Sequence, residues 1–125
     1  MNIKITGSGS SIPGQIQSNS SFSDNSFYDA EGNPISNSNE EIIEKFKAIT
    51  GIEQRRYIHD DQTVADIAIE AARRAIIDAK LDPETLNYII VAHNVGDIDK
   101  NSNQVNTLPS LASKVKAGLQ IKTPN

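Results

Sequence analysis

The stretch Leu86-Asn87-Tyr88-Ile89-Ile90-Val91-Ala92-His93 decides the fold class that the sequence predicts. Its centre, from Tyr88 to Ala92, is a continuous apolar run, which is typical of a strand buried on both faces of a sheet. A helix is predicted before it, over residues 63–80, and another after it, over residues 109–118. The alternation predicts an α/β fold, and helical structure at residues 87–93 would exclude that prediction.

Two helix starts carry capping signals. Thr63-Val64-Ala65-Asp66 opens the helix 63–80, and Ser38-Asn39-Glu40-Glu41 opens a helix predicted over residues 40–50, which Gly51 ends. Strands are predicted near residues 2–7, 52–58 and 87–93. This order favours some parallel pairing, because a helix links successive parallel strands.

Gly7-Ser8-Gly9 follows the first predicted strand. A dinucleotide-binding G-x-G-x-x-G motif fails here because position 12 is isoleucine. We interpret the two glycines as a tight turn at the end of the strand.

Two polar stretches interrupt the regular elements, at residues 18–39 and 96–106. Residues 18–39 are rich in Ser, Asn, Asp and Gly, which favour turns over helix or strand. This stretch is too long for a simple connection, so it is either disordered or a structured excursion. Its possible anchors are its apolar side chains, namely Phe22, Phe27, Tyr28 and Ile35.

Composition excludes several classes of function. Of the 125 residues, 12 are Lys or Arg and 16 are Asp or Glu, and the net charge of −4 argues against nucleic-acid binding. No apolar run approaches the ~18–20 residues that span a bilayer, and residues 1–10 lack the apolar core of a signal peptide, so we expect no membrane partner and a cytoplasmic location. The absence of cysteine removes disulfides, thiolate metal sites and cysteine nucleophiles from these residues.

Three charged clusters are interpreted as structural. We expect His59-Asp60-Asp61 to be a solvated turn. Arg55 and Arg56 should face opposite sides of a strand and therefore cannot address one ligand. The pair Arg73-Arg74 should bind neighbours on its own helix or solvent, with Glu70 and Asp78 as the candidates.

His93 and Asn94 lie at the carboxyl end of the predicted buried strand, where open α/β sheets place their ligands. This position predicts a pocket near residues 93–108. His93 alone is as compatible with a hydrogen-bonded edge residue as with a catalyst. The chain's two histidines assemble no catalytic triad and no metal site.

A family resemblance covers most of the chain. Thr50-Gly51-Ile52-Glu53-Gln54-Arg55-Arg56 resembles the T-G-I-x-x-R-R segment of β-ketoacyl-acyl-carrier-protein synthase III. The surrounding motifs agree in order and spacing: Gly7-Ser8-Gly9-Ser10-Ser11-Ile12-Pro13, Thr63-Val64, Glu70-Ala71-Ala72-Arg73-Arg74-Ala75-Ile76, Ile90-Val91-Ala92 and Leu108-Pro109-Ser110-Leu111-Ala112. Only the two polar stretches fall outside the resemblance.

The resemblance implies a thiolase-like fold, a mixed sheet packed with helices, of which residues 1–125 are the incomplete N-terminal part of the first domain. It also implies an acyltransferase of fatty acid biosynthesis and lipid metabolism, a homodimer that transfers an acyl group to a cysteine and condenses it with a malonyl thioester. In the family that cysteine follows the stretch that resembles Gly118-Leu119-Gln120-Ile121-Lys122. The chain ends before it, so we expect no catalytic residue here and no activity of these residues alone.

Substrate contacts also come from the resemblance. Leu108 stands where the family often has a phenylalanine that lines the acyl pocket of the partner subunit, and Asn94 stands near that pocket. Ile49 and Lys45 replace the arginine and tryptophan that contact the adenine of coenzyme A. The acyl thioester is therefore expected on either coenzyme A or acyl carrier protein, with no cofactor and no metal.

A different class of function stays open. The chain could be a non-catalytic binding or dimerisation module built on a thiolase-like half-fold. A cysteine codon shortly after Asn125 would favour the enzyme, and a stop codon would favour the module. If the chain is part of the enzyme, the remainder of that protein is its expected partner.

Overall fold

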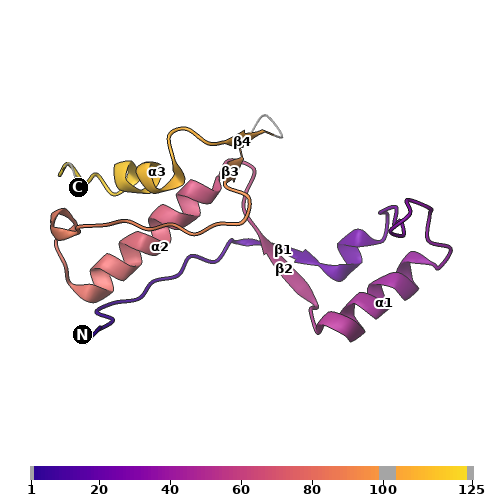
Figure 1. Cartoon of the computed structure of the whole chain (residues 1–125). Helices are drawn as coiled ribbons and strands as arrows, with labels where there is room; N and C mark the ends of the chain where they lie inside the picture. The colour runs from indigo at the N-terminus through magenta and orange to yellow at the C-terminus, as the bar shows by residue number, and fades with distance from the viewer. Residues whose placement is uncertain (1, 99–103, 124–125) are drawn as a thin grey trace. The chain divides into compact units, whose positions relative to one another are not determined.

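The computed structural model describes residues 2–98 and 104–123. They divide into two compact units, which are described separately here (Figure 1). The hairpin unit is Gly14–Tyr57, and the helical unit combines Met1–Pro13 with Ile58–Asn125. Among the described residues the structure is mixed α/β, with three α-helices and small antiparallel sheets.

The hairpin unit is built on two short strands and one helix. Strand β1 (Gln15–Ser18) leads into the 3₁₀ helix η1 (Asn19–Phe22), and α1 (Asn39–Thr50) leads into β2 (Gln54–Tyr57). Strands β1 and β2 pair antiparallel, with Gln15 opposite Tyr57. The helix expected at 40–50 and the strand expected at 52–58 are confirmed.

The polar stretch 18–39 is a structured excursion. The ring of Phe27 meets that of Phe46 on α1 edge-on, with centroids 5.6 Å apart. The Asp29 carboxylate accepts the backbone N–H groups of Glu31 at 3.0 Å and Asn33 at 2.8 Å, closing a tight turn. Of the two alternatives for this stretch, the structure shows the ordered one.

The helical unit is centred on two packed helices. Helix α2 (Val64–Ala79) packs against α3 (Leu111–Gly118), and the 3₁₀ helix η2 (Pro83–Thr85) follows α2. Strands β3 (Asp97–Ile98) and β4 (Val105–Asn106) form a second antiparallel pair. The helices predicted at 63–80 and 109–118 are confirmed. The buried apolar side chains among the described residues of this unit are Ala65 on α2, Leu111 and Val115 on α3, and Ile121, which follows α3.

Two predicted strands are wrong. Neither residues 2–7 nor residues 87–93 form a strand, and the described strand pairs are antiparallel where some parallel pairing was expected. The reason is that a strand requires a neighbour to accept and donate its backbone hydrogen bonds, and no described segment pairs with either stretch. Both stay extended with apolar side chains in solvent: Ile3 is 84% exposed, Ile5 85%, Tyr88 85% and Ile90 91%.

The interpretation of Gly7 and Gly9 as a tight turn is also wrong. Neither glycine has a positive φ. They lie instead where the N-terminal segment crosses α2: a Cβ added to Gly7 would lie 2.6 Å from the Ala75 carbonyl oxygen, and one added to Gly9 only 2.4 Å from that of Ala71. Glycine is needed here because any side chain would collide with the helix backbone.

Candidate functional site

The site predicted after the stretch 87–93 is a loop held on the helical unit. A cavity of about 150 Å³ opens beside this loop. It is lined by His93, Gly96, Asp97, Val105, Asn106, Thr107, Ser110 and Leu111. The pocket expected near residues 93–108 therefore exists, and His93 is part of its wall.

The two predicted substrate-binding residues stand at the ends of this loop. Asn94 is exposed, and Leu108 is 83% exposed and directly precedes the cis peptide bond to Pro109. Neither lines the cavity. Their role in binding an acyl group stays a prediction.

At the wall of the cavity lies a charged side chain that the sequence analysis missed. Asp97 is only 5% exposed and is the one charged side chain that is buried among the described residues. Its Oδ1 accepts the backbone N–H of Ala65 at 3.2 Å, and its Oδ2 accepts a hydrogen bond from Lys114 Nζ at 2.8 Å. No local pattern signals this contact, because its partners stand 32 and 17 residues away in the chain.

The electrostatics of Asp97 favour its charged form. Burial by itself raises the pKa of this carboxyl, but the hydrogen bonds from Lys114 and Ala65 and the charge of Lys114 outweigh burial, so its pKa is lowered from 3.8. The N-terminus of α2, which carries partial positive charge, lies at the same point. Asp97 is therefore an ionised carboxylate at neutral pH.

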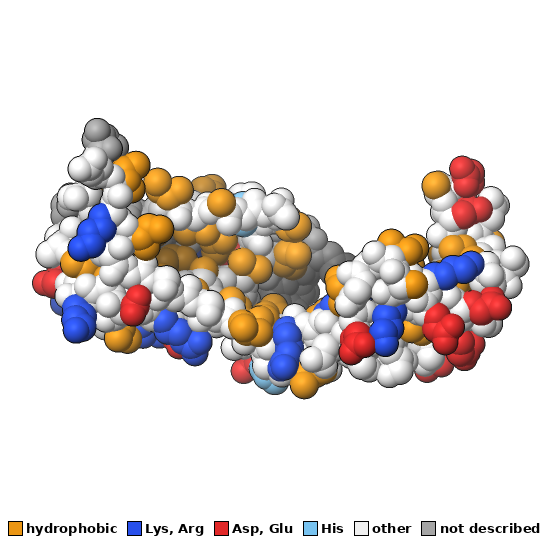
Figure 2. Space-filling view, turned by 90° about the horizontal axis from the view of Figure 1, so that it is seen from below, with side chains coloured by type: hydrophobic (Ala, Val, Ile, Leu, Met, Phe, Trp, Pro, Cys, Tyr) orange, Lys and Arg blue, Asp and Glu red, His pale blue; other side chains and the backbone are white. Residues whose placement is uncertain are grey.

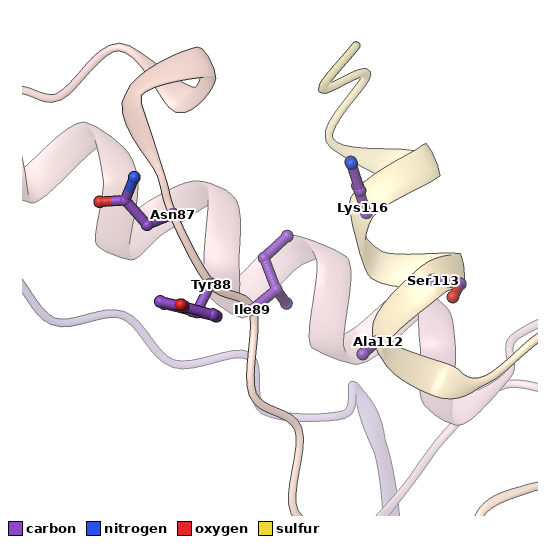
Figure 3. Close-up of a pocket in the computed structure, with 6 residues that line it drawn as sticks. All are labelled: Asn87, Tyr88, Ile89, Ala112, Ser113 and Lys116. Carbon is purple, nitrogen blue, oxygen red and sulfur yellow. The ribbon is translucent and has the colours of Figure 1, made fainter. Parts of the chain in front are cut away.

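A second hollow, of about 220 Å³, lies between the extended stretch and α3 (Figure 3). Its walls are Asn87, Tyr88, Ile89, Ala112, Ser113 and Lys116. Figure 3 shows Ile89 on the side of the stretch that faces α3 and Tyr88 on the opposite side. The residues that line this hollow include no carboxylate and no histidine.

Glu84 holds the chain after α3. Its carboxylate accepts the backbone N–H groups of Lys122 at 2.9 Å and Thr123 at 3.0 Å, and these bonds lower its pKa. The sequence analysis missed this contact as well. It ties the segment after α3 to η2.

The three charged clusters make contacts with neighbouring residues of the chain. Gln62 N–H donates to the His59 carbonyl at 2.9 Å, so His59-Asp60-Asp61 is an exposed turn. Arg73 and Arg74 both bind Glu70. Arg55 stacks over the Phe22 ring at 5.5 Å and binds Asn19, whereas Arg56 reaches the Gly14 carbonyl.

No group of His, Asp and Glu suited to a metal ion occurs within residues 2–98 and 104–123. None of the helices in these same ranges has the length and apolar character needed to cross a membrane.

Lys45 and Ile49 lie on α1 of the hairpin unit. Ile49 is 82% exposed. Lys45 lines a shallow groove together with Asn37, Glu41, Glu44 and Ala48. The hydrogen bond from Asn37 lowers the pKa of Glu41, so this groove carries acidic charge at neutral pH.

The geometry of these sites does not by itself indicate a class of protein, but comparison with known sequences does. No protein-family model matches the chain. The chain is 35% identical over 119 residues, 95% of its length, to "Beta-ketoacyl-[acyl-carrier-protein] synthase III 1" of Vibrio parahaemolyticus. It is 38% identical over 98 residues, 78% of its length, to "Beta-ketoacyl-[acyl-carrier-protein] synthase III" of Staphylococcus aureus.

These matches confirm the resemblance seen in the motifs: over 78–95% of its length the chain is similar to proteins named β-ketoacyl-acyl-carrier-protein synthase III. It spans 31% of the length of the Vibrio protein and 27% of that of the Staphylococcus protein.

Proposed function

We propose that the chain is the N-terminal part of a synthase III-like acyltransferase. The parent protein would transfer an acyl group from a thioester to a cysteine and condense it with a malonyl thioester, with loss of carbon dioxide. The observation that carries this proposal is the 35% identity over 95% of the chain to a β-ketoacyl-acyl-carrier-protein synthase III.

The chemistry divides between this part and the rest of the protein. Covalent acyl transfer needs a nucleophile and donors for the thioester oxyanion. Residues 1–125 contain no cysteine. In this proposal the chain supplies a border of the acyl-binding site, at Asn94 and Leu108, and the remainder of the parent supplies the cysteine. The parent acts as a homodimer.

The acyl carrier is the less conventional part of the proposal. Two acidic side chains, those of Glu41 and Glu44, line the groove beside Lys45 and repel the phosphates of coenzyme A. Ile49 offers no charge to attract them. We therefore propose that the adenine half of coenzyme A contributes little to binding, so that a carrier-protein thioester can serve as the donor.

A chimera tests the proposal. The 119-residue matched segment of the Vibrio enzyme is replaced by the corresponding segment of this chain, and acyl-enzyme formation and condensation are measured beside the unmodified enzyme. We expect both reactions in the chimera, and similar KM values for acyl-coenzyme A and acyl-pantetheine. A chimera that melts cooperatively but forms no acyl-enzyme would overturn the proposal.

A further inference from the structure

Among the described residues of the loop that carries Asn94 and Leu108, Asp97 forms a buried contact with the helices. Asp97, the first residue of β3, contacts α2 through Ala65 and α3 through Lys114. The side chain of Lys114 is 19% exposed and that of Asp97 only 6%, so water screens this pair weakly. One carboxylate therefore links three separate elements.

Asp97 also completes the start of α2. The first turn of a helix leaves N–H groups without a partner inside the helix. Thr63 accepts the Asp66 N–H as the N-cap, and Asp97 accepts the Ala65 N–H from outside the helix. This hydrogen bond fixes the position of Asp97, and with it that of the loop, at the N-terminus of α2.

Two other titratable groups lie near this point, Asp66 and His93. Asp66 is engaged by Thr63, whose N–H it accepts at 2.8 Å. His93 lines the same cavity, and its ring lies 3.5 Å from the position that a Cβ added to Gly96 would take. Lys114 is the cation that neutralises Asp97.

We propose that Asp97 and Lys114 are positioning residues that set where residues 94–98 and 104–108 lie on the helical unit. A buried ion pair contributes little net stability, because desolvation offsets the attraction, but it defines one geometry. Because Asn94 and Leu108 belong to these residues, we expect the ion pair to affect acyl-chain selectivity, and this consequence rests on the proposed function. The positioning of the residues does not depend on the proposed function.

Hydrogen exchange of the 125-residue chain tests the positioning. The variants are Asp97→Asn, Lys114→Met and the double variant. Glu70→Gln is the matched control, because it breaks two exposed ion pairs in the same unit. In both single variants we expect exchange at the amides of residues 97–98 and 105–106 to rise about tenfold or more, with the middle of α2 unchanged. The control should change neither region.

The double variant gives a second readout. Lys114→Met alone leaves a buried carboxylate without its cation, so the loop amides should exchange faster in this variant than in the double variant. If the ion pair served only the stability of the helices, its loss would raise exchange along all of α2, and that result would overturn the proposal. The proposal would also be overturned if the loop amides exchanged at the same rate in the variants, or if they were already unprotected in the wild type.

The chimera described above measures the functional consequence. With Asp97→Asn we expect the KM for the longest accepted acyl donor to rise about tenfold, with kcat for the shortest donor retained. An equal loss of kcat for all donors would overturn the link to selectivity. An inactive wild-type chimera would refute the proposed function, while the exchange experiment would still decide the positioning.

Discussion

At the scale of single residues, Asp97 makes the helical unit sensitive to acid. Its pKa is lower in the folded chain than its ordinary value of 3.8, so between these two values the unfolded chain binds more protons. The stability that Asp97 contributes is therefore complete above about pH 4 and is lost as pH falls through the folded pKa.

We expect Asp97→Asn to remove part of this acid sensitivity. Thermal melts followed by circular dichroism at pH 3 and pH 6 measure it. The wild type should lose more melting temperature on acidification than the variant does. Since Glu84 also has a lowered pKa and keeps its bonds in the variant, some acid sensitivity should persist. Equal losses in both proteins would contradict the assignment.

Gly9 has almost no space for a side chain. A Cβ there would lie 2.4 Å from the backbone of Ala71 and Ala75, so Gly9→Ala must push the N-terminal segment away from α2. Overpacking of this kind costs about 1–3 kcal/mol. Urea denaturation should show this loss in the free energy of unfolding, with Ser10→Ala, an exposed neighbour, as the control. A Gly9→Ala variant as stable as the control would refute the close approach.

At the scale of elements, the start of α2 depends on its capping box. Thr63 and Asp66 each satisfy a backbone N–H of the other. We expect Thr63→Ala to lower the free energy of unfolding by about 1 kcal/mol, measured in urea. Ser38→Ala makes the same change at α1, where the cap is a single bond of 3.3 Å, and should cost less. Equal costs would show that the reciprocal box adds nothing.

The elements predicted correctly from the sequence are those whose signals are local. The capping residues Thr63 and Ser38, and the glycine at position 51 with φ 68°, placed α2 and α1 to within a few residues. The extended conformation of 87–93 also follows locally, since the run is apolar and not helical. Strand pairing does not follow, because it depends on a neighbour that the run itself cannot specify.

The candidate site was predicted in outline only. The end of the apolar run marked the cavity near His93, and the family motifs marked Asn94 and Leu108. The contacts that hold this region, from Asp97 to Lys114 and from Glu84 to Lys122, join residues far apart in the chain. A single sequence carries no periodicity that reports such contacts.

At the scale of the whole molecule, apolar surface stays open on the helical unit. Figure 2 shows hydrophobic side chains gathered on the face of this unit that is viewed, on the left of the picture. Ile3, Ile5, Tyr88 and Ile90 are each more than 80% exposed. At ~25 cal/mol per Å², a few hundred Å² left in water forfeits several kcal/mol, comparable with the stability of a small domain.

We therefore expect the purified chain to associate with itself or with the rest of its protein. Analytical ultracentrifugation at micromolar concentration should show species larger than the 13.6 kDa monomer. Replacing Tyr88 and Ile90 by serine should shift the distribution toward monomer. A compact wild-type monomer that unfolds cooperatively would contradict this expectation.

The isolated chain should also be chemically inert toward acyl donors. Without a cysteine it lacks the nucleophile that the family's reaction needs. After incubation with acyl-coenzyme A, intact-mass spectrometry should show only the unmodified chain. Stoichiometric covalent acylation on any residue would refute this expectation.

The most direct test of the central claim, that this chain is part of a synthase III-like acyltransferase, is the nucleotide sequence of its gene beyond codon 125. The account predicts an open reading frame that continues past Asn125 and encodes a cysteine shortly afterwards, followed by the remaining two-thirds of the enzyme. A stop codon directly after Asn125 would contradict it and would identify the chain as a non-catalytic module.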